Sequence, residues 1–225
     1  MKNIVVLTGA GISAESGIKT FRDADGLWEG HDVMQVASPQ GFIDNPSLVL
    51  DFYNQRRRQL LEVQPNKAHY DLASLEKEYN VTIITQNVDD LHERAGSTNV
   101  VHLHGELLKV RSVNNETAVQ DWKTDLVLGD IDKKGDQLRP HIVWFGEAVP
   151  MFDKAVEICE TADILIIIGT SLQVYPAASL MHYVPENTTT YFIDPKPAYV
   201  NHQKITVIAK PATVGVYEVL KLLQD

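Results

Sequence analysis

Two histidines, His102 and His104, stand in the segment VVHLHGEL at residues 100–107. Because side chains alternate along a β-strand, a strand through this segment carries both histidines on one face, and Gly105 allows the chain to turn after them. An isolated histidine is most often structural. A pair at a strand end is suited to acid–base chemistry, because the pKa of histidine lies near neutrality. One of the two is therefore a candidate general base.

Polar side chains also follow the apolar strand VTIIT at residues 81–85. Ligands bind at the carboxyl ends of the strands in open α/β sheets, so Gln86, Asn87 and Asp89 stand where a site is expected. Asp89 has a second interpretation, because acidic residues favour helix N-termini and a helical segment, LHERAG, follows directly. The pattern leaves both interpretations open.

A glycine-rich turn follows the first strand, IVVL at residues 4–7. Such a turn lets the backbone approach a ligand, and its amide hydrogens, with the first turn of the next helix, can hold a diphosphate. Gly9, Gly11 and Ala14 fit the G-x-G-x-x-G/A spacing of dinucleotide-binding turns. Turns of this kind also occur for purely steric reasons, so the motif alone does not decide between a dinucleotide-binding site and a steric role.

The stretch after this turn differs from the corresponding stretch of a dehydrogenase. That fold has a strand ending in Asp or Glu about twenty residues on, which holds the adenine ribose. Residues 17–32, GIKTFRDADGLWEGHD, show no strand pattern and predict a long loop over the site. Phe21, Leu27 and Trp28 indicate that this loop is packed. Arg22 could pair with a phosphate or with a surface carboxylate.

A helix is predicted to begin at Pro46 and to continue through SLVLDFYNQRRRQLLEV. Tyr53 and Arg56 fall on its apolar stripe, one turn apart. A guanidinium turned toward the interior needs an anionic or hydrogen-bonding partner, so the pair is a candidate reader of a carboxylate. Successive steps of about 100° carry Arg57 and Arg58 away from the stripe, and we expect them to be solvated.

Two further apolar strands end in glycine. DILIIIGTS at residues 163–171 is typical of a central parallel strand. RPHIVWFGEAVP at residues 139–150 predicts a strand that ends at Gly146 and Glu147. Its edge could take up an extended peptide, although a core strand with a tight turn is the simpler interpretation. The segment 108–138 between these motifs has no usable periodicity.

Composition excludes several classes of function. The 225 residues suit one α/β domain with a smaller appended module. A formal charge of -10 and a pI near 5.2 argue against nucleic acid or an anionic membrane as partner. No stretch approaches the length of a membrane span and no basic leader is visible, so we expect a cytoplasmic protein. Cys159, the single cysteine, excludes an internal disulfide and any multi-cysteine zinc site, and its apolar surroundings predict a core position.

Five motifs together resemble the sirtuin family, the NAD-dependent protein lysine deacylases. GAGISAESGIKTFR, TQNVDDLH, HLHGEL, IVWFGE and GTSLQVYP occur in that family's order and span nearly the whole chain. YNQRRRQL is similar to the Tyr-x-x-Arg motif of the bacterial branch that removes acidic acyl groups, here Tyr53 and Arg56.

The resemblance implies an α/β fold, a Rossmann-like parallel sheet domain with a smaller inserted module that lacks a zinc ribbon. The whole chain, residues 1–225, would be a single catalytic domain. We expect the large part at about residues 1–20, 66–104 and 141–225, and the small module at about residues 21–65 and 105–140.

The resemblance also implies roles for individual residues. NAD would be consumed as an ADP-ribosyl donor, with His104 as general base and Asp89 on the nicotinamide carboxamide, giving nicotinamide, free lysine and O-acyl-ADP-ribose. The implied NAD-binding residues are Gly9, Ala10, Gly11, Glu15, Phe21, Arg22, Trp28, Gln86, Asn87, Asp89, Gly169, Thr170, Ser171, Asp194 and Ala212. The residues implied to bind the acyl-lysine substrate are Tyr53, Arg56, Val143, Phe145, Gly146 and Glu147.

The chain departs from the family's pattern at two places. Most relatives carry two Cys-x-x-Cys pairs for a structural zinc between HGEL and RPHIVWFGE, whereas this chain has no cysteine there. We therefore expect no zinc or other metal, and a segment 108–138 that is held by packing alone. In FIDPKP the family more often has Asn where Asp194 stands, although a carboxylate can still accept from ribose hydroxyls.

Other classes of function stay open. An oxidoreductase could use the same glycine-rich turn, but the missing acidic end of a second strand weighs against it. An NAD-dependent ADP-ribosyltransferase or NAD hydrolase, or an NAD or ADP-ribose binding module, could be built on the same fold. Acylated lysine side chains of proteins are the expected partner. The sequence leaves open the target proteins, the preferred acyl group and the oligomeric state, and a monomer is compatible with it.

Overall fold

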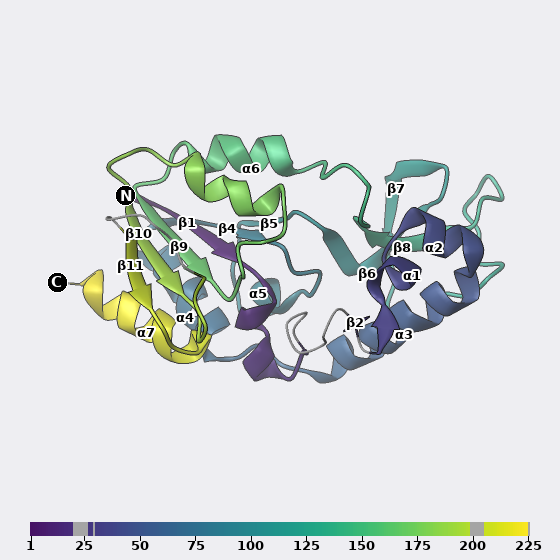
Figure 1. The fold of residues 1–225 in the computed structure, drawn as a ribbon, viewed down its shortest axis with the longest axis horizontal. Coiled ribbons are helices and arrows are strands. Elements are labelled where there is room, and N and C mark those ends of the chain that lie inside the picture. The colour runs from purple at the N-terminus through teal and green to yellow at the C-terminus, as the bar shows by residue number, and fades with distance from the viewer. Residues whose placement is uncertain (20–26, 29, 199–204, 225) are drawn as a thin grey trace.

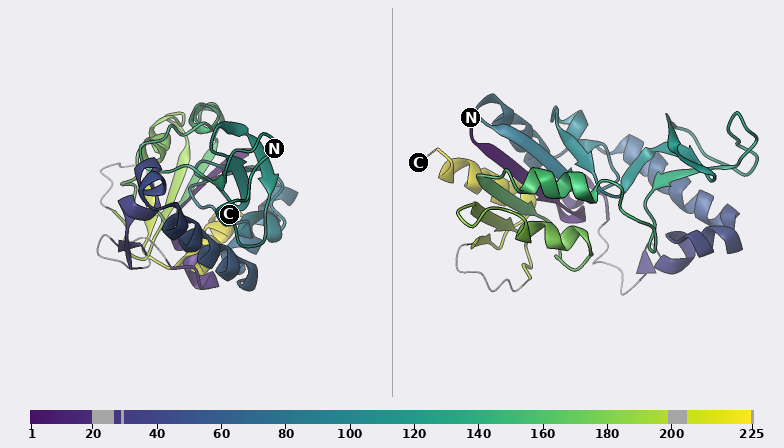
Figure 2. Two further views of the ribbon diagram at one scale, coloured as in Figure 1. Left: turned by 90° about the vertical axis from the view of Figure 1, so that its right-hand side faces the viewer. Right: turned by 90° about the horizontal axis from the view of Figure 1, so that it is seen from above.

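The computed structural model describes residues 1–19, 30–198 and 205–224, and for residues 27 and 28 the backbone alone. The molecule is elongated, with a parallel sheet at one end and a smaller antiparallel sheet at the other (Figure 1). The view from above separates the same two parts along the long axis (Figure 2). The predicted α/β class with a parallel sheet and a smaller module is confirmed.

The large sheet has the strand order β11-β10-β9-β1-β4-β5, and all neighbouring strands are parallel. Its register places Thr8, at the end of β1, beside Thr85 of β4 and Ile168 of β9. The strand order reverses at β1, and ligands bind at such points in open α/β sheets. The strands are β1 (Asn3–Thr8), β4 (Asn80–Thr85), β5 (Val100–His102), β9 (Ile164–Ile168), β10 (Thr189–Ile193) and β11 (Ile205–Ile208).

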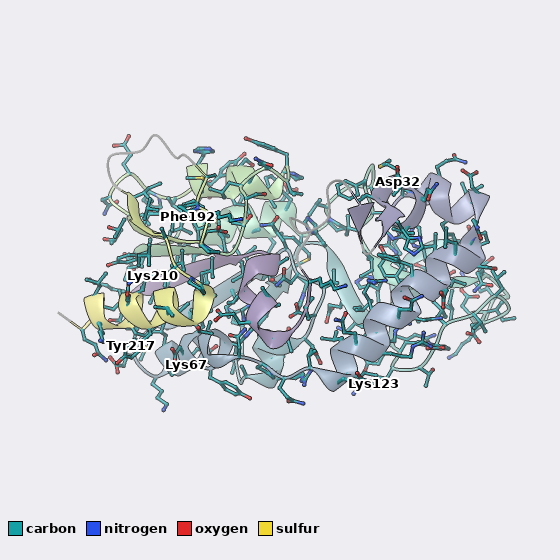
Figure 3. All side chains as sticks on the ribbon, turned by 60° about the horizontal axis from the view of Figure 1, so that its bottom comes forward. Asp32, Lys67, Lys123, Phe192, Lys210 and Tyr217 are labelled. Atoms are coloured by element: carbon teal, nitrogen blue, oxygen red, sulfur yellow. The ribbon has the colours of Figure 1, made fainter. Side chains whose placement is uncertain are left out.

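Helices cover both faces of this sheet, and β9 is buried along its whole length. Helices α4 and α7 lie side by side on one face, where Lys67 Nζ is 5.0 Å from the centroid of the Tyr217 ring (Figure 3). Cys159 lies in the core of the other face as predicted, and burial raises the pKa of its thiol to about 12. The helices are α4 (Lys67–Ser74), continued by η4 (Leu75–Lys77), α7 (Ala212–Leu222), α6 (Phe152–Cys159) and η5 (Ala177–His182).

The other end of the molecule consists mostly of residues proposed for the small module, although its last strand continues past residue 140 to Ile142. Helices α1 to α3 pack against an antiparallel sheet of order β7-β6-β8, and β2 pairs with β3. Helix α3 begins as predicted, because the Asn45 side chain accepts from the Leu48 amide at 3.1 Å and Pro46 is the first helical residue. The elements are β2 (Leu27–Trp28), β3 (His31–Asp32), α1 (Val33–Val36), α2 (Pro39–Asp44), α3 (Pro46–Glu62), β6 (Gly105–Ser112), β7 (Asn115–Asp121) and β8 (Leu138–Ile142).

The strand predicted across residues 100–107 is two strands. β5 ends at His102 and β6 begins at Gly105, whose φ is +83°. A Cβ at Gly105 would lie 2.0 Å from the carbonyl oxygen of His141, so this turn requires glycine. The chain leaves the parallel sheet here, and His104 stands at the exit.

Segment 108–138 is not held by packing alone, which corrects the expectation from the sequence. Asn54 of α3 donates from Nδ2 to the carbonyl of Leu126 at 2.9 Å, and its Oδ1 accepts from the Leu126 amide at 2.8 Å. Leu126 is fully buried, in a cluster with Leu50, Val110 and Leu138. A buried side-chain amide thus pairs with the backbone of the segment as a neighbouring strand would.

Arg57 is buried rather than solvated. Its Nε donates to the carbonyl of Leu107 at 3.2 Å and its Nη1 to Asn54 Oδ1 at 2.7 Å. Burial lowers the pKa of its guanidinium to about 10, although the charge of Asp125 opposes this. The prediction holds for Arg58, which is half exposed and pairs with Asp125 at 2.8 Å. The difference arises because the antiparallel sheet and segment 108–138 cover a second face of α3, which carries Arg57.

We expect Asn54→Ala to lower the free energy of unfolding by at least about 2 kcal/mol, because it leaves a buried amide and a buried carbonyl without partners. Urea denaturation measures this change. Gln55→Ala is the matched control, because Gln55 is exposed and its side chain bonds on the surface to Asp51 at 2.7 Å. This variant should cost less than about 0.5 kcal/mol. Equal losses in the two variants would contradict the role of Asn54.

In the described part of the chain no helix combines the length and apolar composition needed to cross a bilayer.

Candidate active site

The turns after β1 and β9 pack directly against each other. The amides of Gly9 and Gly11 donate to the carbonyls of Ile168 and Gly169, at 3.0 and 2.9 Å. A Cβ on Gly11 would lie 2.5 Å from the Gly169 Cα, so the close approach needs glycine on both turns. These two amides therefore have backbone acceptors already. The steric interpretation explains both glycines.

The turn continues as two short 3-10 helices, η1 (Ala10–Ile12) and η2 (Ala14–Ser16), rather than as a long helix. Ser13, between them, is fully buried and donates to Asp89 Oδ2 at 2.9 Å. Its Oγ also accepts from Asn87 Nδ2 at 3.1 Å. Ser13 thus joins the first motif to the polar residues after β4. Nothing in the sequence distinguishes it from the other small residues of its motif.

Both carboxylate oxygens of Asp89 are hydrogen-bonded within the protein. Its Oδ1 accepts from the amide of Leu91, the first residue of α5 (Leu91–Arg94), at 3.2 Å, while Oδ2 binds Ser13. Burial raises the pKa of the Asp89 carboxyl to about 6, although the hydrogen bonds from Ser13 and Leu91 lower it. The carboxyl therefore changes charge close to neutrality.

A chain of buried hydroxyls lies beneath this turn. Thr8 Oγ1 donates to Thr85 Oγ1 at 2.8 Å, and Thr85 Oγ1 accepts from the Asn87 amide at 3.0 Å. His92 Nε2 lies 3.2 Å from Thr8 Oγ1 and donates to it, because the Thr8 hydrogen is already used. The ring of His92 packs against His69, with centroids 4.9 Å apart. These contacts fix the ends of β1 and β4 to each other.

His104 is oriented by a backbone carbonyl. Its Nδ1 lies 3.0 Å from the Gln86 oxygen, which can only accept, so Nδ1 carries the hydrogen and Nε2 keeps its lone pair. Burial lowers the pKa of His104 below its ordinary value, and the bond to Gln86 offsets this only in part. The ring is therefore neutral at pH 7. The amide of Val143 donates to the His104 carbonyl at 2.9 Å and fixes the backbone.

The ends of β4 and β9 are joined as well. Gln86 Nε2 donates to Thr170 Oγ1 at 3.3 Å, and the same hydroxyl accepts from the Leu172 amide at 3.2 Å. Ala10 and Ser171 are half-buried near these strand ends. The three motifs that follow β1, β4 and β9 therefore meet at one edge of the sheet, as the resemblance implies.

Three of the predicted NAD-binding residues lie toward α7 and β10. Glu15 is tied to the start of α7, because its carboxylate accepts from the Thr213 amide at 2.9 Å and from the Thr213 hydroxyl at 2.8 Å. Asp194 is buried and its Oδ1 accepts from the Lys196 amide at 2.8 Å. Ala212 is buried as the first residue of α7. Phe21, Arg22 and the Trp28 side chain lie outside the described residues.

The Glu147 carboxylate is bound within the protein. It pairs with Arg139 at 2.6 Å and with Arg111 at 3.3 Å, and accepts from the Trp144 amide at 2.8 Å. The Arg139 guanidinium also stacks on the Trp144 ring, with Cζ 3.3 Å from its centroid. Glu147 therefore shapes the loop after β8 from inside, and direct contact with a substrate is not needed to explain it.

The remaining residues of this loop were predicted to continue a strand. β8 ends earlier, at Ile142, because Glu147 and Gly146, with φ of +91°, turn the chain back. The amide of Phe145 donates to the Ala37 carbonyl at 2.9 Å, and the Phe145 side chain is 43 % exposed. Val143 is half-buried, so the loop presents a partly open apolar surface.

Tyr53 and Arg56 lie one turn apart on α3, and Tyr53 packs against this loop. Trp144 Nε1 donates to the Tyr53 hydroxyl at 2.9 Å, and burial raises the pKa of the phenol so that it stays protonated. Arg56 is half-buried, stacks on Phe52 with Cζ 3.9 Å from the ring centroid, and donates to the Phe52 carbonyl at 2.7 Å. The structure thus brings Tyr53 to the loop whose first residue binds the backbone of His104.

Within the residues the structure describes, no group of three or more His, Cys, Asp or Glu side chains is arranged to hold a metal ion.

Comparison with known proteins shows which family carries these motifs. The profile of the Sir2 family matches residues 9–176. A protein of Helicobacter pylori (strain ATCC 700392 / 26695) named NAD-dependent protein deacylase is 67% identical over 196 residues, which cover 87% of this chain and 86% of the relative. A protein of the same name from Bacteroides thetaiotaomicron is 57% identical over 230 residues, covering 99% of this chain and 98% of the relative.

Solved structures agree in fold. A Sir2 homologue in complex with NAD has a TM-score of 0.89 and 40% identity, and the match covers 99% of this chain and 90% of that one. A Sir2 protein bound to an acetylated peptide has a TM-score of 0.81 and 28% identity, covering 98% and 93%. With a profile match over most of its length and relatives this similar along the whole chain, the protein is a member of the Sir2 family.

Proposed function

We propose that this protein is an NAD-dependent protein-lysine deacylase with His104 as its general base. The observation that carries the proposal is the His104 ring, which is fixed by the Gln86 carbonyl with its Nε2 lone pair available and its pKa below the ordinary value. Similar proteins are named NAD-dependent protein deacylase, and similar structures hold NAD or an acetylated peptide. His104 Nε2 accepts a proton from a ribose hydroxyl during the reaction.

The side chains at the sheet edge have the chemistry that NAD requires. Bound NAD supplies an electrophilic ribose carbon and nicotinamide as the leaving group. The Asp89 carboxylate and the Asn87 amide, both held by Ser13, suit a carboxamide and a ribose. Thr170 offers a hydroxyl on the β9 side. Buried Asp194 is suited to accept from ribose hydroxyls.

On the other side of His104, the loop from Val143 to Glu147 is suited to an extended acyl-lysine peptide, because its exposed side chain is apolar and its backbone is fixed. Tyr53 and Arg56 would recognise an acyl group with a carboxylate, such as succinyl or malonyl. The acidic net charge of -10 supports partners other than nucleic acid and anionic membrane, and we propose a cytoplasmic location.

A peptide panel tests the function. Peptides carrying acetyl-, succinyl- or malonyl-lysine, and an unmodified control, are incubated with NAD and the enzyme, and the products are identified by mass. We expect O-acyl-ADP-ribose and free lysine from the acylated peptides alone. Formation of NADH would instead identify an oxidoreductase. Attachment of ADP-ribose to protein, or NAD cleavage that ignores the peptide, would identify a transferase or a hydrolase.

The pH dependence follows from two groups. Asp89 must be ionised to accept from a carboxamide, and its pKa is about 6. His104 must be neutral, and its pKa lies below the ordinary value. Because lowering the pH protonates both, we expect kcat/KM for NAD to fall as the pH drops through about 6. Initial rates with acetyl-peptide, measured from about pH 5 to about pH 8, test this. A profile that stays flat to about pH 5 would contradict it.

A further inference from the structure

His102 lies beside the site with both ring nitrogens facing oxygen atoms. Nδ1 is 3.1 Å from the carbonyl oxygen of Asn87, and Nε2 is 2.7 Å from Oε1 of Glu93. A carbonyl and a carboxylate both accept. A neutral imidazole has only one N–H and can satisfy only one of them, whereas an imidazolium donates to both. The geometry therefore fits a protonated ring.

The neighbouring His104 has the opposite arrangement. One of its nitrogens faces the Gln86 carbonyl, and within the described residues no carboxylate bonds to the other. Gln86 and Asn87 are consecutive, so the two histidines hold consecutive carbonyls of one turn. The sequence pattern treats the histidines as alternatives for one role, whereas their surroundings suit a cation at His102 and a neutral base at His104.

Asn87 is held at three points from three segments of the chain. Its amide donates to Thr85, its carbonyl accepts from His102, and its side chain donates to Ser13. His102 is the only one of these partners that can change charge. Loss of its proton would free either the Asn87 carbonyl or the Glu93 carboxylate.

We propose that His102 and Glu93 form a positioning pair, in which the His102 imidazolium is held by the Glu93 carboxylate and clamps the Asn87 carbonyl, fixing the turn that faces nicotinamide. The inference rests on the proposed function for the identity of the ligand. In this proposal His102 is a positioning residue, because its hydrogen bonds are to Asn87 and Glu93. It acts through Asn87 and, along the same turn, through the carbonyl that orients His104.

The surrounding charges agree with this role. Burial lowers the pKa of His102, but the hydrogen bond and charge of Glu93 outweigh it, with help from the Asn87 carbonyl and Glu106, so that the pKa is raised above its ordinary value. Correspondingly, although burial raises the pKa of Glu93, the bond from His102 lowers it below its ordinary value. Among the described residues, Lys109 and Asp89 also face the pair, and Lys109 acts on Glu93 while it is paired with Glu106 at 2.8 Å. Two buried histidines face it as well: His69, on which the charge of Glu93 acts, and His92, on which His102 acts. The pKa of both histidines lies below the ordinary value.

The sign of the pH effect follows. A histidine whose pKa is raised on folding contributes stability to the folded state. This contribution is complete below its pKa in the unfolded chain, near 6.5, and is lost as the pH rises through its pKa in the folded protein. The clamp therefore weakens on the alkaline side. We expect an alkaline limb in kcat/KM for NAD, opposite to the acidic limb of Asp89 and His104.

Glu93→Gln tests the pair, because it keeps the shape of the side chain and removes the charge that holds the imidazolium. Histidine-ring nitrogen NMR should show His102 titrating at a pH about one unit lower than in the wild type. The alkaline limb should move with it. At a pH above the pKa of His102 in both proteins, KM for NAD in Glu93→Gln should exceed that of the wild type by up to about tenfold, while KM for the acyl-peptide stays unchanged. His102→Gln, which cannot titrate, should remove the limb.

Glu106→Gln is the matched control, because Glu106 is a nearby carboxylate that bonds to Lys109 rather than to His102. Its charge is the smallest of the contributions that raise the pKa of His102, so Glu106→Gln should shift the limb much less than Glu93→Gln does. The pair would be overturned by Glu93→Gln and His102→Gln profiles that superimpose on the wild type, or by a wild-type His102 that titrates below the ordinary value. The NMR titration needs no turnover. A wild type without deacylase activity would therefore refute the proposed function, while the titration still decides on the pair.

Discussion

His104→Ala is expected to reduce the turnover of acyl-peptide by about a hundredfold to ten-thousandfold while NAD binding stays near normal. The variant removes the lone pair at Nε2 that accepts a proton. The Gln86 carbonyl, which orients the ring and is half-buried, loses its hydrogen-bond donor in this variant. The fold around it is still held by the Val143 and Thr170 contacts. His104→Tyr should behave in the same way, because a phenol is a poor acceptor of a proton at neutral pH.

Calorimetric titration with NAD and steady-state rates separate the two effects. His182→Ala is the control, because His182 is an exposed histidine on η5. It should retain wild-type turnover. A His104 variant with near-normal turnover would remove this residue from its role as base, and a variant that no longer binds NAD would show that its role is structural.

Arg56→Met is expected to lower kcat/KM for a succinyl-peptide by well over tenfold and to leave deacetylation comparatively intact. Removing one partner of a desolvated charge pair costs about 2 to 5 kcal/mol. Methionine keeps the length and the packing on Phe52, where the guanidinium stacks at 3.9 Å, but offers no donor to a carboxylate. Acetyl-lysine carries no carboxylate and so loses little.

Arg58→Met is the matched control, half a turn further on the same helix, where the arginine is paired with Asp125 on the surface. Both activities should survive this change. Equal losses of desuccinylation and deacetylation in Arg56→Met would show that Arg56 maintains the fold rather than reads the acyl group. Tyr53→Phe should give a smaller loss, since Tyr53 already accepts from Trp144.

The sequence predicts the parts of the fold that depend on local pattern. The apolar runs of β1, β4 and β9 and the start of α3 at Pro46 are confirmed, because each carries its own signal of burial or capping. The burial of Arg57 could not be predicted in this way. One helix face is visible in the periodicity, but the segment that covers the other face reaches Asn54 from Leu126, 72 residues away.

The candidate site also divides into residues that the sequence pattern marks and contacts that only the fold creates. The motifs that contain His104 and Asp89 mark the edge of the sheet, and the structure brings them together. The bonds that fix them could not be read from the sequence. Thr8 and Thr85 are 77 residues apart and meet only because the parallel register places them side by side. Ser13 is one of several small residues in a glycine-rich turn, and only its position in space distinguishes it.

The most direct test of the account is the stoichiometry of NAD cleavage. With an acetyl-lysine peptide in excess, we expect each nicotinamide released to be matched by one deacylated lysine and one O-acyl-ADP-ribose, and no release when the peptide lacks the acyl group. Nicotinamide release at the same rate with and without the acylated peptide would contradict lysine deacylation and, with it, the assignment of His104.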